Sequence, residues 1–119
     1  MTAEASAIIT IGHSNRPVDE FVAALQGNGV TAVADVRSAP YSRFNPAFNR
    51  EQLKSALQAR DISYVFLGKE LGGRPSDPAC YENGRASYLR MAQTEEFKRG
   101  LERVIHGSEL HRIALKAIH

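Results

Sequence analysis

Apolar residues are grouped into short runs that alternate with longer amphipathic segments. Runs rich in β-branched residues occupy 7–11, 31–36 and 62–67, and another begins at Ile113. Each run is too short for a stable helix and is bounded by turn-forming residues. The pattern therefore predicts four strands, of which the first two are expected to be buried.

The segment between the first two runs has the spacing of a helix. Ser14 or Asn15 can cap its N-terminus, and Pro17 suits its first turn. Gly27 and Gly29 are expected to end it, because glycine favours the helix C-terminus. The apolar face of this helix consists of Phe21, Val22 and Leu25.

Further helices are expected after the second and third strands. Asn49 followed by Gln52 resembles a capping box, and the helix it starts has an inner face of Leu53, Ala56 and Leu57. Residues 68–84 contain four glycines and two prolines, so a long loop of the kind that often binds ligands is expected. Helical patterns follow at 85–92 and 94–106. Their candidates for burial are Tyr88, Leu89, Phe97, Leu101, Val104 and Ile105.

Strands that alternate with helices predict an α/β fold, a single compact domain over residues 1–119 with a mostly parallel sheet flanked by helices. A hydrophobic fraction of 43% and a charged fraction of 24% are ordinary globular values and exclude disordered and fibrous proteins. No apolar run approaches the length of about 18 residues that indicates a membrane span, and Met1–Thr10 lacks the basic start of a signal peptide. With Cys80 as the lone cysteine, a cytoplasmic protein without a membrane partner is expected.

The carboxyl ends of parallel strands share one rim, where open α/β sheets bind their ligands. The pattern places residues 12–15, 35–37 and 67–70 on this rim. A net charge of +2 permits an anionic ligand without requiring one. The functional site is therefore expected at this rim.

Three residues on the rim are candidates for proton transfer: His13, Asp35 and Glu70. Histidine side chains ordinarily change charge near neutral pH, so His13 could act as acid or base, and so could the two carboxylates. Each also has a structural interpretation. His13 could merely bond a neighbouring loop, Asp35 could fix an arginine, and the glycines beside Glu70 could serve tight turns that need a positive φ.

The candidate ligand-binding residues are Ser14, Asn15, Arg37, Arg43, Tyr64 and Arg74. Arginine offers a planar fork to phosphate or carboxylate, although ordinary surface arginines are the alternative. Ser14 and Asn15 could bind an anion together with helix amides, and Tyr64 could stack on a ring or pack within its strand. Metal-binding motifs such as H-E-x-x-H or paired cysteines are absent from the sequence, so no metal is expected and any cofactor stays open.

Three motifs carry a family resemblance: T-I-G-H-S at 10–14, D-V-R-S-x-P-x-S-R-x-N-P-x-F at 35–48, and Tyr64 with L-G-x-E-L-G-G-R at 67–74. In these motifs the chain resembles the DUF488 family, which has no settled common activity. The resemblance implies a compact α/β fold with an enzymatic or ligand-binding site where the motifs meet. Family members usually continue with Cys-Ala-Glu and Cys-His-Arg segments, whereas this chain reads R-I-A-L-K-A-I-H at 112–119, so the resemblance implies a shortened C-terminus.

The leading functional hypothesis is an enzyme that acts on an anionic small molecule, a nucleotide or a nucleic-acid component. The alternatives are a non-catalytic module that binds a nucleotide or nucleic acid, and an inactive structural fragment. If the shortened C-terminus leaves part of the sheet uncovered, self-association into a homo-oligomer or a lowered stability is expected.

Overall fold

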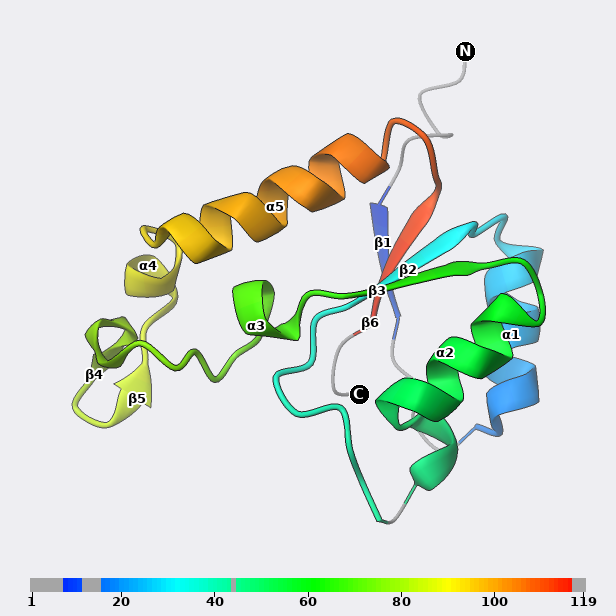
Figure 1. Ribbon diagram of the computed structural model, residues 1–119, viewed down its shortest axis with the longest axis horizontal. Helices are drawn as coiled ribbons and strands as arrows, with labels where there is room; N and C mark the ends of the chain where they lie inside the picture. The colour runs from blue at the N-terminus through cyan, green and yellow to red at the C-terminus, as the bar shows by residue number, and fades with distance from the viewer. Residues whose placement is uncertain (1–7, 12–15, 44, 117–119) are drawn as a thin grey trace.

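A parallel sheet forms the centre of the protein. The computed structural model describes residues 8–11, 16–43 and 45–116. Its four-stranded sheet contains β1 (Ile8–Ile11), β2 (Ala32–Asp35), β3 (Ser63–Phe66) and β6 (Ile113–Lys116) in the order β1-β6-β2-β3 (Figure 1). All three neighbouring pairs are parallel. The predicted α/β fold with a parallel sheet is confirmed.

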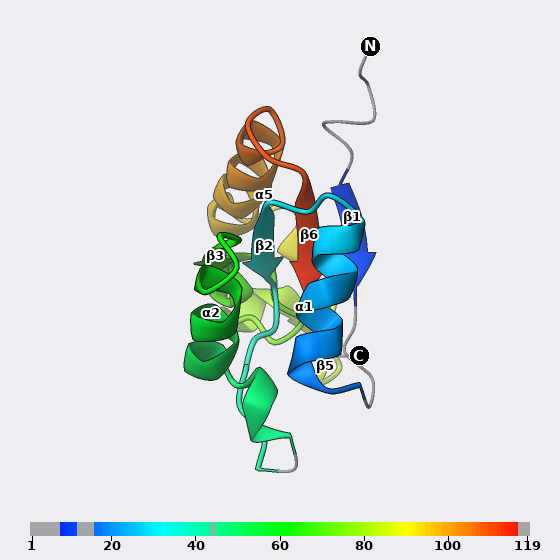
Figure 2. The ribbon, with the colours of Figure 1, turned by 90° about the vertical axis from the view of Figure 1, so that its right-hand side faces the viewer.

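The connecting helices explain why the last strand lies inside the sheet. The crossovers through α1 (Val18–Gly27) and α2 (Arg50–Gln58) cover one face, and α5 (Glu95–Gly107) lies on the other (Figure 2). The chain thus moves across the sheet in one direction on one face and returns on the other face, which keeps the same hand of crossover. β6 consequently enters between β1 and β2.

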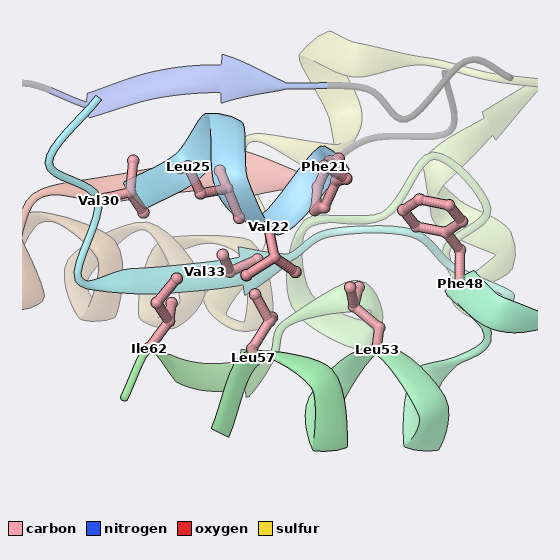
Figure 3. Packing of buried hydrophobic residues seen from close by; sticks show 10 residues of the cluster. Phe21, Val22, Leu25, Val30, Val33, Phe48, Leu53, Leu57 and Ile62 are labelled. Carbon is pink, nitrogen blue, oxygen red and sulfur yellow. The ribbon is translucent and has the colours of Figure 1, made fainter. Parts of the chain in front are cut away.

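The main core lies between the sheet and the helices α1 and α2. Val33 of β2 projects between the side chains of the two helices (Figure 3). The predicted inner faces of both helices are confirmed by burial of Phe21, Val22, Leu25, Leu53 and Leu57, each at most 2% exposed. The ring of Phe48 packs edge-on against Phe21 with centroids 5.1 Å apart. Since Phe48 lies in η2 (Pro46–Phe48), this contact anchors the loop that follows β2.

The opposite face of the sheet is covered less completely. α5 packs mainly on the short helix α3 (Gly68–Leu71), and Val104 is its buried apolar contact with the sheet. The predicted burial of Val104 is confirmed, but the predicted burial is wrong for two side chains of α4 (Tyr88–Met91) and two of α5, because Val104 is the α5 side chain that packs into the described core cluster on this face. Those side chains are Tyr88 (77% exposed), Leu89 (81%), Leu101 (45%) and Ile105 (54%).

The segment after α3 contains a small hairpin that the sequence analysis missed. After the 3-10 helix η3 (Pro78–Cys80), β4 (Tyr81–Glu82) pairs antiparallel with β5 (Arg85–Ala86), and α4 (Tyr88–Met91) follows. The turn residues Asn83 and Gly84 have φ values of +54° and +79°, as a two-residue type I′ turn requires. The expected continuous loop over 68–84 and the expected helix start at residue 85 were therefore wrong. The Asn-Gly dipeptide was the available signal.

Two predicted helix caps were also wrong. The N-cap of α1 is Pro17, which makes no side-chain cap bond, so neither Ser14 nor Asn15 occupies that position. Asn49 is the N-cap residue of α2, as expected, but its side chain does not cap the helix. Its Oδ1 accepts a bond of 2.7 Å from the backbone N–H of Ser42 instead, which ties down the loop after β2. The predicted end of α1 is confirmed at Gly27.

None of the helices in the described ranges is long and apolar enough to cross a membrane.

Candidate functional site

Asp35 and Arg37 form a buried ion pair at the carboxyl end of β2. Asp35 is the last residue of the strand and is 0% exposed, while Arg37 is 8% exposed. The Nε and one terminal nitrogen of Arg37 donate to the two carboxylate oxygens of Asp35, each at 2.8 Å. The backbone N–H of Arg37 donates to the same carboxylate at 3.2 Å. This fork-to-carboxylate geometry fixes the chain where it leaves the sheet.

Tyr64 joins the pair from the neighbouring strand. Val33 is the register partner of Tyr64 in β3, so the Tyr64 side chain lies on the same face of the sheet as Asp35. Its hydroxyl donates to Asp35 Oδ2 at 2.7 Å. The half-buried tyrosine is therefore held by its hydroxyl, in addition to packing within its strand.

These contacts fix the protonation states of both groups. Burial raises the pKa of Asp35, but the hydrogen bonds from Arg37 and Tyr64, with the charge of Arg37, outweigh burial and bring the pKa below its usual 3.8. Burial and the Asp35 carboxylate raise the pKa of Tyr64 above its usual range. At neutral pH Asp35 is thus ionised and Tyr64 is protonated. Asp35 is better suited to orient its partners than to act as a general base.

Lys116 brings a second buried cation to the same place. It is the last residue of β6, is 0% exposed, and lies in register with Asp35. Burial, followed by the nearby charge of Arg37, lowers its pKa to about 8, although Asp35 offsets part of this effect.

Arg50 is a half-buried cation near the carboxyl end of β3. It is the first residue of α2, and its guanidinium carbon is 4.3 Å from the ring centre of Phe66. Phe66 is the register partner of Asp35 in β3, so the two strand ends are adjacent. Asp35, Arg37, Arg50, Tyr64 and Lys116 are called the rim cluster below.

Lys116 and Arg50 were not among the site residues predicted from the sequence. Recognising Lys116 requires knowing that β6 lies between β1 and β2, which no local pattern reveals. Arg50 could have been found from its place at the start of α2, where a helix that follows β2 begins at the expected rim.

Two glycines of the L-G-x-E-L-G-G-R motif allow the chain to pack behind Arg37. A Cβ at Gly68 would collide with the carbonyl oxygen of Arg37, and a Cβ at Gly72 with Oγ of Ser38. The same Ser38 Oγ accepts a bond of 2.9 Å from the backbone N–H of Arg74. The expectation that these glycines need positive φ was wrong, since the positive-φ glycines of the described chain lie elsewhere. Glycine is needed at 68 and 72 because Arg37 and Ser38 lie too close to leave room for a Cβ atom.

The other predicted site residues do not join the rim cluster in the described contacts. Glu70 lines a separate cavity of about 270 Å³ beside α5, together with Glu95, and none of the rim cluster lines that cavity. Arg43 is exposed on the loop after β2, and Arg74 is exposed beyond α3. His13, Ser14 and Asn15 lie outside the described residues, so their roles stay predictions.

A metal site is not formed by the part of the chain that the structure describes, because no three of its His, Cys, Asp or Glu residues are grouped to hold an ion. Cys80 is 2% exposed. Burial and the charges of Asp77 and Glu96 raise the pKa of its thiol, which disfavours the reactive thiolate.

Comparison with protein families now places the chain. The model of the family described as "Domain of unknown function DUF488" matches residues 17–117. The chain belongs to this family. The matched region contains all of the rim cluster and both later DUF488 motifs, at 35–48 and 67–74, whereas the 10–14 motif precedes it. Neither the curated proteins nor the solved structures gave a match to the chain.

Proposed function

We propose that this DUF488 protein is an enzyme that acts on an anionic small molecule, such as a nucleotide or another phosphate-bearing compound, at the rim cluster. The observation that supports the proposal is the charge of the cluster. Arg37 and Lys116 are buried beside one carboxylate, that of Asp35, and Arg50 adds a third cation. Three cations gathered at one strand edge create a local positive potential, which favours a negatively charged ligand.

The contacts assign different tasks to these groups. Asp35 and Tyr64 hold each other and Arg37 in place, so Arg37 presents a guanidinium of fixed orientation. Arg50, which is half-buried, is the cation that an entering ligand meets. Lys116, with a pKa of about 8, can gain or lose a proton near neutral pH and is the proton-transfer group of the rim cluster. His13 stays a second proton-transfer candidate.

A non-catalytic binding module is the second candidate. It is favoured by the engagement of Asp35 in several hydrogen bonds and by the location of Glu70 in another cavity. Two of the three acid or base groups expected from the sequence are then not presented to a ligand at the rim cluster. A module for nucleic acid would lose affinity steeply as the salt concentration rises, whereas a site for one small anion would not.

Binding can be tested by calorimetric titration with inorganic phosphate and with nucleoside monophosphates and triphosphates. We expect at least one of these anions to bind, and Arg50→Gln to weaken binding about tenfold because a charge-assisted contact is lost. Lys54→Gln is the matched control, since Lys54 is an exposed cation on the same helix. Absence of binding, or equal affinity in Arg50→Gln, would contradict the proposal.

Turnover separates the enzyme from the binding module. The bound nucleotide is incubated with the protein, and its products are followed by phosphorus NMR. Lys116→Met keeps a long unbranched side chain but removes the amine that gains and loses a proton. Turnover by the native protein that is lost in Lys116→Met while binding persists supports the enzyme, whereas binding without turnover in the native protein supports the module.

A further inference from the structure

The opposite face of the sheet carries an apolar groove beside α5. The groove has a volume of about 190 Å³ and lies between β2, β3 and the second half of α5. Ala32, Ala34 and Val65 form its floor, and Val104 and Gly107 form the wall on α5. Tyr64 is the member of the rim cluster that lines it, whereas Asp35, Arg37, Arg50 and Lys116 do not. The groove thus adjoins the rim cluster at Tyr64, but the inference below does not rest on the proposed function.

The groove exists because the residues around it are small. Ala32 and Ala34 project toward α5 from β2, where larger side chains would fill the space. Gly107 adds no side chain to the wall, and a Cβ there would lie 3.2 Å from Cδ1 of Ile113. Val104 alone of the α5 side chains in the described core cluster reaches this face of the sheet. The space is thus a consequence of residue size along two elements.

Two residues with basic side chains line the groove. They are Arg103 on α5 and His111 in the turn before β6, and no described acidic residue lines the groove with them. Nδ1 of His111 is 3.0 Å from Oγ1 of Thr31, and the same Oγ1 accepts a bond of 3.1 Å from the backbone N–H of Arg112. The imidazole is therefore held in place, while Arg103 is exposed and free to adjust to a ligand.

We propose that this groove binds a small apolar monocarboxylate. Its ring or short alkyl chain lies on Ala32, Ala34 and Val65, and its carboxylate meets Arg103 and His111. Apolar floors with few well-placed polar groups are typical of small-molecule sites. A volume of about 190 Å³ is below the range of about 300–1,000 Å³ for drug-sized ligands, so the ligand has one ring or a short chain.

The test uses 3-phenylpropionate and its uncharged amide, 3-phenylpropanamide, which have nearly the same shape. Each is titrated into the whole chain, and binding is followed by two-dimensional ¹H–¹⁵N NMR. We expect the carboxylate to bind more tightly than the amide and to shift the resonances of Val65, Gly107 and Ile113. Arg103→Glu should weaken carboxylate binding about tenfold, because attraction is replaced by repulsion. Arg99→Glu is the control, being exposed one turn earlier on α5 and outside the groove.

A second variant tests the groove itself. Ala32→Leu fills the floor and should abolish binding of both compounds, with circular dichroism and the NMR spectrum reporting whether the variant is folded. If Ala32→Leu is unfolded, the Arg103→Glu result decides. The proposal is overturned if native protein does not bind 3-phenylpropionate, if the amide binds equally well, or if a folded Ala32→Leu binds unchanged. Shifts of the groove resonances with protein concentration alone would show a second copy of the chain there, and would overturn it too.

Discussion

At the residue scale, the position of Asp35 decides how the site is understood. The sequence left it as a proton-transfer group or as the partner of an arginine. The structure shows the last arrangement, because the carboxylate accepts bonds from Arg37 and Tyr64 while fully buried. A buried charge of this kind stabilises the fold only as long as its partners remain. Its removal should therefore affect stability first.

Asp35→Asn is expected to lower the free energy of unfolding by about 3–5 kcal/mol, because Arg37 is left as a buried cation without its carboxylate. Tyr64→Phe removes a single bond to a charged acceptor and should cost about 1.5–3 kcal/mol. Urea denaturation measures both, with Glu51→Gln on the exposed side of α2 as a control near zero. A loss in Asp35→Asn no larger than that in the control would show that the ion pair contributes little.

The lowered pKa of Lys116 leads us to expect that the free energy of unfolding depends on pH. Its pKa is about 8 in the folded protein, below its usual 10.5. Between these values the unfolded chain holds a proton that the folded protein has released, so the free energy of unfolding should rise as pH increases from 8. Tyr64 has the opposite effect above its usual pKa of 10.0, because its pKa is raised by folding.

The useful window for this measurement is therefore pH 8 to 10. Urea denaturation at several pH values across it should show increasing stability in the native protein and a flatter profile in Lys116→Met. Lys54→Met, at an exposed position, should keep the native profile. If the stability of the native protein stays constant or falls as pH increases, the surroundings do not disfavour the protonated form of Lys116.

At the element scale, the sequence predicted what local pattern determines. The four strands and the inner faces of α1 and α2 follow from apolar spacing, and the structure confirms them. The expected burial of the first strand was wrong, because β1 lies at the edge of the sheet and Ile8 is 40% exposed. Strand order does not follow, because β6 pairs with strands more than 70 residues earlier in the chain. Without that order, Lys116 could not be placed beside Asp35. The predicted burial of Leu101 and Ile105 was wrong because the apolar spacing of a helix does not reveal how closely the helix approaches the sheet.

The packing of α3 behind β2 also depends on contacts that spacing does not reveal. Gly68 is buried against the carbonyl oxygen of Arg37 and the ring of Phe66. Gly68→Ala should lower the free energy of unfolding by about 1–3 kcal/mol, the usual cost of overpacking, because backbone must move. Gly73→Ala is the matched control in the same motif, since nothing lies within 4 Å of the added Cβ.

Thermal or urea denaturation compares the two glycine variants. The backbone shift that Gly68→Ala causes should also displace Arg37. Gly68→Ala should therefore lower the affinity of the rim cluster for an anion, whereas Gly73→Ala should leave that affinity unchanged. If the two variants have equal stability, the close approach of α3 to Arg37 does not constrain the fold.

At the scale of the whole molecule, the two faces of the sheet are unequally covered. The described structure is flat, with principal extents of 41 × 41 × 18 Å, and α5 with the β4–β5 hairpin extends to one side of the sheet (Figure 1). Its radius of gyration is 14.8 Å, compared with about 13 Å for a compact domain of about 100 residues. An extended arrangement leaves more apolar surface in contact with water.

Leu101 and Ile105 are the clearest part of that surface. They lie one turn apart on α5, and are 45% and 54% exposed. Neither residue lines the groove proposed above. Apolar side chains that are adjacent and exposed on one helix favour contact with another protein surface. We therefore expect the chain to self-associate through this side of α5 as its concentration rises.

Light scattering across a dilution series measures this association. The average mass of the native protein should rise with concentration, while the double variant Leu101→Gln with Ile105→Gln should stay monomeric, because the apolar contact is removed without disturbing the core. Leu110→Gln is the control, since Leu110 is 80% exposed but lies in the turn after α5. A native protein that stays monomeric over the whole series, or a double variant that associates equally well, would show that water rather than a second copy covers this side of α5.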